Sequence, residues 1–358
     1  MSASFHSLKI TDVRREIDDA VSLAFDLPDA LRETFRYAPG QHLTLRAMLD
    51  GEDVRRNYSI CAAPHENELR VAIKHVPGGR FSGWANTRVG VGDEVEVMAP
   101  HGSFTYGFDP ARAATYVAFA AGSGITPILS LLKSALAIEP NSRFVLLYGN
   151  RASNSIMFLE ELADLKNRHM DRLQVFHFLS EEAEDVDLFN GRLDLARAGE
   201  AIGALIDPKS VTAAFVCGPS PMMDSARDAL LAAGVPSAVI LSERFSAAEL
   251  SADQLAQVHA LEQKAAGLKV QVSLEGRRRR IAFDPAKGSI LENARAAGMP
   301  APFACKAGVC ATCRAKVVQG KVEMKANYGL SPEEVAQGYV LTCQAVPLTD
   351  DVVLDYDA

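Results

Sequence analysis

The spacing of hydrophobic and polar residues divides the first part of the chain into two regions. Up to about residue 107, short runs such as HLTLRAML, LRVAIKHV and DEVEVMAP alternate between apolar and polar residues, and turn sequences such as DGED and PGG separate them. Alternation with a period of two predicts strands that bury one face, and frequent turns join such strands into antiparallel hairpins. We therefore predict a small antiparallel β-barrel over residues 1–107.

From about residue 108 the pattern changes. Continuous apolar runs such as ATYVAFAA, RFVLLYGN and TAAFVCG now alternate with helical stretches such as IMFLEELADLKNRH. Continuous apolar strands between amphipathic helices are typical of a parallel sheet covered on both faces, which we predict over residues 108–245. A polar, alanine-rich stretch at 246–266 predicts a partly helical linker. Short strands, one helix and a cysteine-bearing loop then predict a third domain at 267–358.

The net charge and the hydropathy of the chain exclude some classes of protein. The net charge of −8 argues against a nucleic-acid partner, which requires a basic face. An uncharged stretch at 113–132 has the length of a membrane helix, but Gly122, Gly124 and Pro127 interrupt it. The first residues lack the apolar core of a signal peptide. We expect a cytoplasmic protein without a membrane partner.

Four of the six cysteines form the clearest chemical pattern. Cys305, Cys310 and Cys313 are spaced C-x4-C-x2-C, and Cys343 follows. Structural zinc prefers paired C-x2-C knuckles, and a Rieske centre needs two histidines, whereas none follows His259. The spacing is that of a plant-type [2Fe–2S] cluster, for which we predict these four cysteines as ligands.

With these ligands, the segment from about residue 268 to the C-terminus resembles plant-type ferredoxins. The resemblance implies an α+β fold of the β-grasp type. The family usually carries an arginine after the first cysteine of the motif, and Lys306 stands there in this chain. The small residues of the loop, such as Gly308 and Ala311, would let backbone amides approach the cluster and stabilise its negative charge.

Two further motifs point to a flavin. RRNYS at 55–59 and GGRFS at 78–82 occur in the order found in the ferredoxin–NADP reductase superfamily, which this part of the chain resembles. The resemblance implies that Arg56 meets the flavin pyrophosphate, Tyr58 packs on the isoalloxazine and Ser59 lies near its N5 atom. It implies FAD rather than FMN, bound with help from Lys74, Gly79, Arg80, Phe81 and Ser82.

A third motif points to a pyridine nucleotide. AGSGITP at 121–127 follows a predicted strand and precedes a predicted helix, with Thr126 as N-cap and Pro127 as first helical residue. A helix N-terminus of this kind binds anions. The reductase superfamily has a similar motif for the NAD(P) pyrophosphate, although Ala121 replaces its first glycine. The nucleotide-binding residues implied are Gly122, Gly124, Thr126 and Pro127.

The ends of two later strands complete the predicted site. CGPSPM begins at Cys217, and in the superfamily this turn, with Gly218 and Pro219, approaches the nicotinamide; a merely buried cysteine remains the alternative. In SERF, the family places residues near the flavin, which here are Glu243 and Phe245. Together with Ser59, we predict Cys217 and Glu243 to be catalytic.

Arg151 follows the second strand of the predicted parallel sheet. A guanidinium at this place could pair with a 2′-phosphate, which favours NADPH, while NADH and a plain surface arginine remain alternatives.

The order of the three domains resembles that of one-chain oxygenase reductases. The resemblance implies that electrons pass from NADPH through FAD and the [2Fe–2S] cluster to a di-iron oxygenase. Two alternatives stay open: a reductase for a ring-hydroxylating or carnitine-type oxygenase, and a ferredoxin-like carrier with an inactive reductase half.

Overall fold

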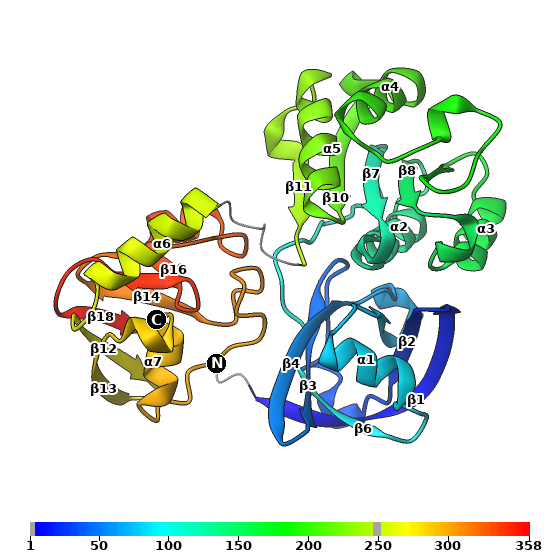
Figure 1. Ribbon diagram of the computed structural model, residues 1–358. Helices are drawn as coiled ribbons and strands as arrows, with labels where there is room; N and C mark the ends of the chain where they lie inside the picture. Colours follow the sequence, from blue (N-terminus) through cyan, green and yellow to red (C-terminus); the bar gives the residue numbers. More distant parts are fainter. Residues whose placement is uncertain (1–3, 246–251) are drawn as a thin grey trace. The chain divides into compact units, whose positions relative to one another are not determined.

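The computed structural model describes residues 4–245 and 252–358 (Figure 1). One compact unit comprises Phe5–Arg244, and a second comprises the C-terminal region from Phe245 onward. Among the helices of the described ranges, none is both long and apolar enough to cross a membrane.

The first unit begins with an antiparallel barrel, as the alternating pattern predicts. Its six-stranded sheet has the order β4-β3-β6-β1-β2-β5. An isolated bridge between Ile60, which follows β4, and Val71 of β5 joins the two edge strands and closes the sheet. Fully buried side chains such as Leu23, Leu43 and Val97 fill the interior. The strands are β1 (Phe5–Ile17), β2 (Ala20–Phe25), β3 (His42–Leu49), β4 (Glu52–Ser59), β5 (Leu69–Lys74) and β6 (Glu94–Met98), and helix α1 is Arg80–Thr87.

The second half of the same unit is a parallel sheet with helices on both faces, which confirms the predicted α/β class. The sheet order is β11-β10-β7-β8-β9. The strands are β7 (Thr115–Ala121), β8 (Arg143–Asn150), β9 (Leu173–Leu179), β10 (Val211–Cys217) and β11 (Ile240–Glu243). The helices are α2 (Ile125–Ile138), α3 (Leu159–Arg168), α4 (Leu195–Leu205) and α5 (Ser220–Ala232).

Strands β7 and β10 are neighbours, but the helices that follow them cover opposite faces of the sheet. Residues of α2 belong to one core cluster, and residues of α5 belong to the other. The loops after the two strands therefore diverge, and a crevice forms at the carboxyl ends of the strands. Open parallel sheets bind their ligands at such switch points.

The start of α2 corrects one prediction. Thr126 is not the N-cap and Pro127 is not the first helical residue. A 3₁₀ turn at Gly122–Gly124 runs directly into α2, which begins at Ile125 with Gly124 as N-cap. The Thr126 hydroxyl instead donates to the Ser123 carbonyl over 3.0 Å. Pro127 still lies in the first turn, where its missing N–H costs no hydrogen bond.

Buried polar contacts fasten α2 to the barrel. The Ser130 hydroxyl donates to the carbonyl of Ala62 over 2.7 Å. The ammonium of Lys133, a residue only 7% exposed, lies 2.7 Å from Glu66 of the barrel and 2.8 Å from Glu161 of α3. The helix that carries the glycine-rich loop at its start is thus held to the barrel at its middle.

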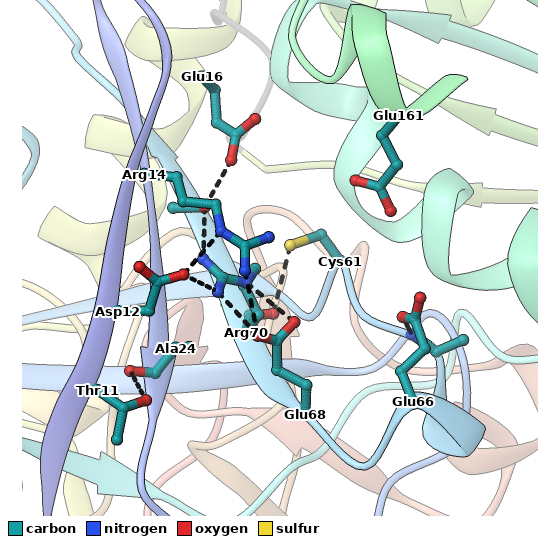
Figure 2. Close-up of polar contacts among 12 residues, drawn as sticks. Thr11, Asp12, Arg14, Glu16, Ala24, Cys61, Glu66, Glu68, Arg70 and Glu161 are labelled. Atoms are coloured by element: carbon teal, nitrogen blue, oxygen red, sulfur yellow. Dashed lines mark hydrogen bonds and ion pairs between the residues drawn. The ribbon is translucent and has the colours of Figure 1, made fainter. Parts of the chain in front are cut away.

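A second buried charge lies beside this interface, on β5 (Figure 2). Arg70 is 4% exposed and pairs with Asp12 at 2.6 Å and Glu68 at 2.8 Å. These hydrogen bonds lower the pKa of both carboxyls. Arg70 also donates to the Ser22 hydroxyl, which donates in turn to Glu16. The buried guanidinium therefore has acceptors on three sides, as a buried charge requires.

The second unit is an α+β domain of the expected β-grasp type. Its mixed five-stranded sheet has the order β13-β12-β18-β14-β16, with β12 and β18 parallel. These strands are β12 (Lys269–Leu274), β13 (Arg277–Ala282), β14 (Arg314–Gln319), β16 (Tyr339–Leu341) and β18 (Val352–Asp355). A two-stranded sheet adds β15 (Val322–Met324) and β17 (Ala345–Pro347), and the helices are α6 (Ala252–Lys264), α7 (Ile290–Ala296) and α8 (Pro332–Ala336).

Helix α6 occupies most of the predicted linker, whose residues 246–251 lie outside the described residues. Leu261 and Ala265 pack against the core of the second unit. Glu262, 9% exposed, forms an ion pair with Lys325 at 2.9 Å. The later part of the segment is therefore packed rather than a free tether. The domain boundaries drawn from the sequence remain predictions.

Candidate functional site

The glycine-rich loop after β7 and the end of β10 approach each other closely. A Cβ atom on Gly124 would lie 2.1 Å from the carbonyl oxygen of Cys217, so only glycine fits. Gly122 has a left-handed φ of +51° and faces open space. The hydroxyl of Tyr148 donates to the Gly122 carbonyl over 3.0 Å and fixes the loop. The loop is thus shaped to leave room for a ligand beside its backbone.

A cavity of about 580 Å³ opens at the carboxyl ends of the parallel strands. Four residues predicted to bind cofactors line it: Lys74, Gly122, Arg151 and Pro219. Among the lining residues that the sequence did not single out are Asn150 and Arg192. The lining contains three cationic residues, Lys74, Arg151 and Arg192, and one acidic residue, Asp194, so the cavity favours an anionic ligand.

The side chain of Asn150 indicates that the cavity binds a polar ligand. Its side-chain amide nitrogen is buried and forms no well-directed hydrogen bond among the described residues, although the side chain lies near the Tyr148 hydroxyl. A buried donor without a partner costs free energy, and a bound polar group can satisfy it. The donor, the cationic side chains and the open loop together fit a pyridine dinucleotide.

Ser59, Cys217 and Glu243, which we call the Ser–Cys–Glu cluster, come together from distant parts of the sequence. The Ser59 hydroxyl donates to Glu243 over 2.9 Å, across 184 positions of the chain. Cys217 and Glu243 are register partners on the neighbouring strands β10 and β11. Burial, and then the charge of Glu243, raise the pKa of the Cys217 thiol, which therefore stays protonated.

One neighbour of the cluster had no signal in the sequence. His42, the first residue of β3, is 5% exposed, and its Nδ1 atom lies 3.4 Å from the free oxygen of Glu243. A single histidine at a strand start has no motif around it, and the segment that brings Glu243 to it lies far away in the sequence. Only the tertiary structure could reveal this contact.

The barrel side of the site offers the elements that a flavin requires. The half-buried ring of Tyr58 lies 5.6 Å from that of Phe81, and burial raises the pKa of Tyr58. Arg56, also on β4, is exposed and donates to the carbonyl of Arg55 over 2.7 Å. A flat amphipathic ring next to an exposed guanidinium fits an aromatic ring with an attached pyrophosphate.

The GGRFS loop forms a compact turn at the start of α1. Gly79 is the N-cap, and a Cβ atom on it would lie 2.6 Å from the Ser82 hydroxyl, which accepts a hydrogen bond from the Val76 amide. Phe81 is buried in the barrel core, and Arg80 pairs with Glu52. Because these two side chains are engaged elsewhere, the loop offers a phosphate its backbone amides.

The last predicted contact of the flavin, Phe245, has a side chain that is 44% exposed. It belongs to the second unit, and its predicted role remains a prediction.

The four predicted cluster ligands interact in two pairs within the second unit. The thiol of Cys305 contacts that of Cys310, and the thiol of Cys313 contacts that of Cys343. In the described residues no three His, Cys, Asp or Glu side chains enclose a single metal ion. Two pairs fit a cluster with two irons, each held by two thiolates, better than they fit one zinc.

Tight backbone turns shape the cysteine loop. Lys306, Gly308 and Ala311 all have left-handed φ angles, and the Ala307 amide donates to the Cys305 sulfur over 3.3 Å. A Cβ atom on Gly329 would lie 3.0 Å from the Ala311 amide nitrogen, so a second segment lies directly against the loop. No pattern in the sequence indicated this support. Such close backbone packing fits a loop that surrounds a [2Fe–2S] cluster with amides.

Comparisons with known proteins agree with the division of the chain into a barrel, a parallel α/β sheet and an α+β domain with four cysteines. Three family models match: the oxidoreductase FAD-binding domain at residues 7–106, the oxidoreductase NAD-binding domain at 119–228 and the 2Fe-2S iron-sulfur cluster binding domain at 272–348. The chain belongs to the family of electron-transfer reductases that join these three domains, and it is an oxidoreductase that uses FAD, a pyridine nucleotide and a [2Fe–2S] cluster.

Within that family, the chain is 46% identical over 355 residues to a subunit of 1,2-phenylacetyl-CoA epoxidase of Escherichia coli, covering 99% of this chain and 98% of the relative. It is 34% identical to the ferredoxin reductase component of 3-ketosteroid-9-alpha-monooxygenase of Rhodococcus rhodochrous, covering 98% of this chain and 96% of the relative.

Solved structures share the fold. Phthalate dioxygenase reductase superposes with a TM-score of 0.59 at 24% identity, and 98% of each chain is covered. An intact type IV self-sufficient cytochrome P450 monooxygenase gives a TM-score of 0.71 at 24% identity, but the match spans only 41% of that longer chain. These structures support the fold class and add nothing about the substrate.

Proposed function

We propose that this chain is the reductase component of a phenylacetyl-CoA epoxidase system in phenylacetate catabolism. In this role it takes electrons from NADPH and delivers them to a di-iron oxygenase in the cytoplasm. The full-length identity of 46% to the 1,2-phenylacetyl-CoA epoxidase protein of Escherichia coli supports the choice of acceptor. The observation that carries the reductase activity itself is the Ser–Cys–Glu cluster, which lies at the junction of barrel and parallel sheet.

The residues of the site would have different roles toward the bound cofactors. Bound FAD would supply hydride acceptance, and a bound [2Fe–2S] cluster would supply transfer of single electrons. Tyr58 supports the flavin ring, and Ser59 holds its hydroxyl toward Glu243 so that its oxygen lone pairs remain available at the ring. Cys217 keeps a neutral thiol in a buried place against which the nicotinamide can pack.

The phosphates of the cofactors would be bound by backbone amides and cationic side chains. Gly122 leaves the loop before α2 open to the nucleotide pyrophosphate, and Gly124 lets that loop pack closely against the end of β10. Cys305, Cys310, Cys313 and Cys343 would hold the two irons.

The preference for NADPH depends on cationic side chains at the cavity. Arg151 is exposed and lies 4.0 Å from Asp19, so it is free to turn toward a phosphate, and Arg192 lines the same cavity. Since a charge-assisted hydrogen bond contributes about 1.5–3 kcal/mol, Arg151→Ala should lower kcat/KM for NADPH by about 10–100-fold and leave that for NADH nearly unchanged. Arg192→Ala tests the second cation.

Arg227→Ala is the matched control, because Arg227 is exposed on α5 and does not line the cavity. If both cavity variants keep the wild-type ratio of NADPH to NADH turnover, these arginines do not select the nucleotide.

Reconstitution tests the proposed acceptor. The purified holoprotein is mixed with NADPH and the oxygenase component of a phenylacetyl-CoA epoxidase, and NADPH consumption is compared with epoxide formation. We expect coupled turnover that Cys313→Ser abolishes, while reduction of ferricyanide by NADPH persists. If NADPH reduces the flavin but leaves the cluster oxidised, the proposed electron path is wrong. Coupling to a 3-ketosteroid-9-alpha-monooxygenase instead would reassign the partner.

A further inference from the structure

His42 and Ser59 lie against the two oxygens of the same carboxylate. They are register partners on the barrel strands β3 and β4. Ser59 donates to one oxygen of Glu243 at 2.9 Å, and His42 Nδ1 lies 3.4 Å from the other oxygen. Glu243 itself stands on β11 of the parallel sheet, with a side chain that is 12% exposed. A nearly buried carboxylate thus reaches across from one sheet, accepts a hydrogen bond from Ser59 and lies close to His42 of the other sheet.

The neighbours of His42 determine which ring nitrogen carries the hydrogen. The Thr44 hydroxyl donates to the side-chain oxygen of Asn57 over 3.0 Å, which orients the Asn57 amide. The Asn57 amide nitrogen lies 3.2 Å from His42 Nε2 and donates to it. Nε2 is therefore the acceptor, so the hydrogen is on Nδ1, where it faces Glu243.

The residues around the His42 imidazole ring also keep the ring in its place. The His101 ring packs edge-on against His42 with centroids 4.2 Å apart, and the backbones of the two residues form an isolated β-bridge. Gly102 has a φ of +122°, and a Cβ atom there would lie 2.8 Å from His42 Nδ1. A side chain at position 102 would displace the ring, so the glycine keeps His42 in reach of Glu243.

We propose that His42 is a positioning residue of the reductase site that acts through Glu243. The Nδ1–H group of His42, whose nitrogen lies 3.4 Å from one carboxylate oxygen, limits rotation of the Glu243 side chain, so that the other oxygen stays in place to orient the Ser59 hydroxyl. Without this polar neighbour, the Glu243 carboxylate can rotate away from Ser59 more easily. The inference deepens the proposed function and rests on it, since it assigns a role within the Ser–Cys–Glu cluster.

Steady-state kinetics of the full-length holoprotein, with NADPH as donor and ferricyanide as acceptor, test the proposal without the oxygenase. His42→Phe keeps a ring against His101 but removes the donor, and His42→Asn places an amide nitrogen near the position of Nδ1. We expect His42→Phe to lower kcat about tenfold with KM changed less than about twofold, and His42→Asn to recover kcat to within about threefold of the wild type.

His6→Phe is the matched control. His6 lies on β1 of the same barrel, and its ring meets Phe35 at 5.6 Å. This variant makes the same chemical change outside the site and should leave kcat unchanged. FAD content and Tm are measured for every variant, because a merely structural defect would lower these as well.

A double-mutant cycle with Glu243→Gln decides whether His42 acts through the carboxylate. On the Glu243→Gln background, His42→Phe should cost less than about threefold in kcat, because the two residues form one unit. An equal loss of kcat on both backgrounds overturns the proposal, and so does a loss that only follows FAD content. A wild-type holoprotein that does not oxidise NADPH would overturn the proposed function, and the inference with it.

Discussion

Replacing Gly124 by alanine tests how the nucleotide loop is assembled. Gly124 has a φ of −61°, which alanine adopts readily, so the only obstacle to the substitution is space. The added Cβ atom would lie 2.1 Å from the carbonyl oxygen of Cys217, 2.5 Å from its carbonyl carbon and 2.8 Å from the amide nitrogen of Gly218. All three are backbone atoms, so no side chain can turn aside. The start of α2 or the end of β10 must move by roughly 1.5 Å, the difference from an ordinary contact of about 3.5 Å or more.

The surroundings make this movement costly. Ile125, Ile128 and Leu129 follow Gly124 in α2 and are fully buried, so a shift of the helix disturbs the core beneath it. Forcing extra atoms into a packed interior typically costs about 1–3 kcal/mol. In a unit of this size, about 2 kcal/mol lowers Tm by roughly 4–8 °C. The shift also moves Cys217 relative to the loop, so we expect kcat/KM for NADPH to fall at least about tenfold.

Differential scanning calorimetry and NADPH–ferricyanide kinetics measure both effects. Gly203→Ala is the matched control, because Gly203 is exposed in helix α4 with no atom within 4 Å of an added Cβ. Alanine should stabilise that helix by about 0.5–1 kcal/mol. If Gly124→Ala keeps the wild-type Tm and the wild-type kcat/KM, the close approach of the two backbones has no role in building the site.

Two further predictions concern the interface between barrel and α/β half. Burial raises the pKa of Glu16 above its ordinary value of 4.5, although a hydrogen bond from Ser22 partly opposes the shift (Figure 2). The folded state therefore binds the proton of the Glu16 carboxyl more tightly than the unfolded state does. The free energy of unfolding of the wild type then falls as the pH rises from the ordinary pKa to the raised pKa. Glu16→Gln should raise Tm at pH 8 but not at pH 4; an equal shift at both would contradict this cause. Lys133→Met leaves Glu66 and Glu161, each about one-third exposed, without their cation. We expect a loss of about 1–3 kcal/mol in urea unfolding, partly recovered by adding Glu161→Gln; an unchanged midpoint would refute it.

The predictions that succeeded from sequence depend on local patterns. The period of two and the alternation of apolar runs with helices indicated the barrel and the parallel sheet, and the spacing of four cysteines indicated the cluster. The start of α2 was predicted wrongly at Thr126, because a 3₁₀ turn supplied the first hydrogen bonds of the helix without any side-chain cap. Local sequence does not distinguish a threonine that caps a helix from one inside its first turn.

By itself, the sequence determined the three kinds of domain and their order, because such features depend on neighbours along the chain. Only the tertiary structure decided which polar residues meet. The contact of Glu243 with His42 depends on where β11 ends relative to β3. Asn150 and Arg192 line the cavity only because the loops that carry them meet there. Such contacts are set by the packing of the barrel against the parallel sheet, a property of the whole unit that no short stretch of sequence encodes.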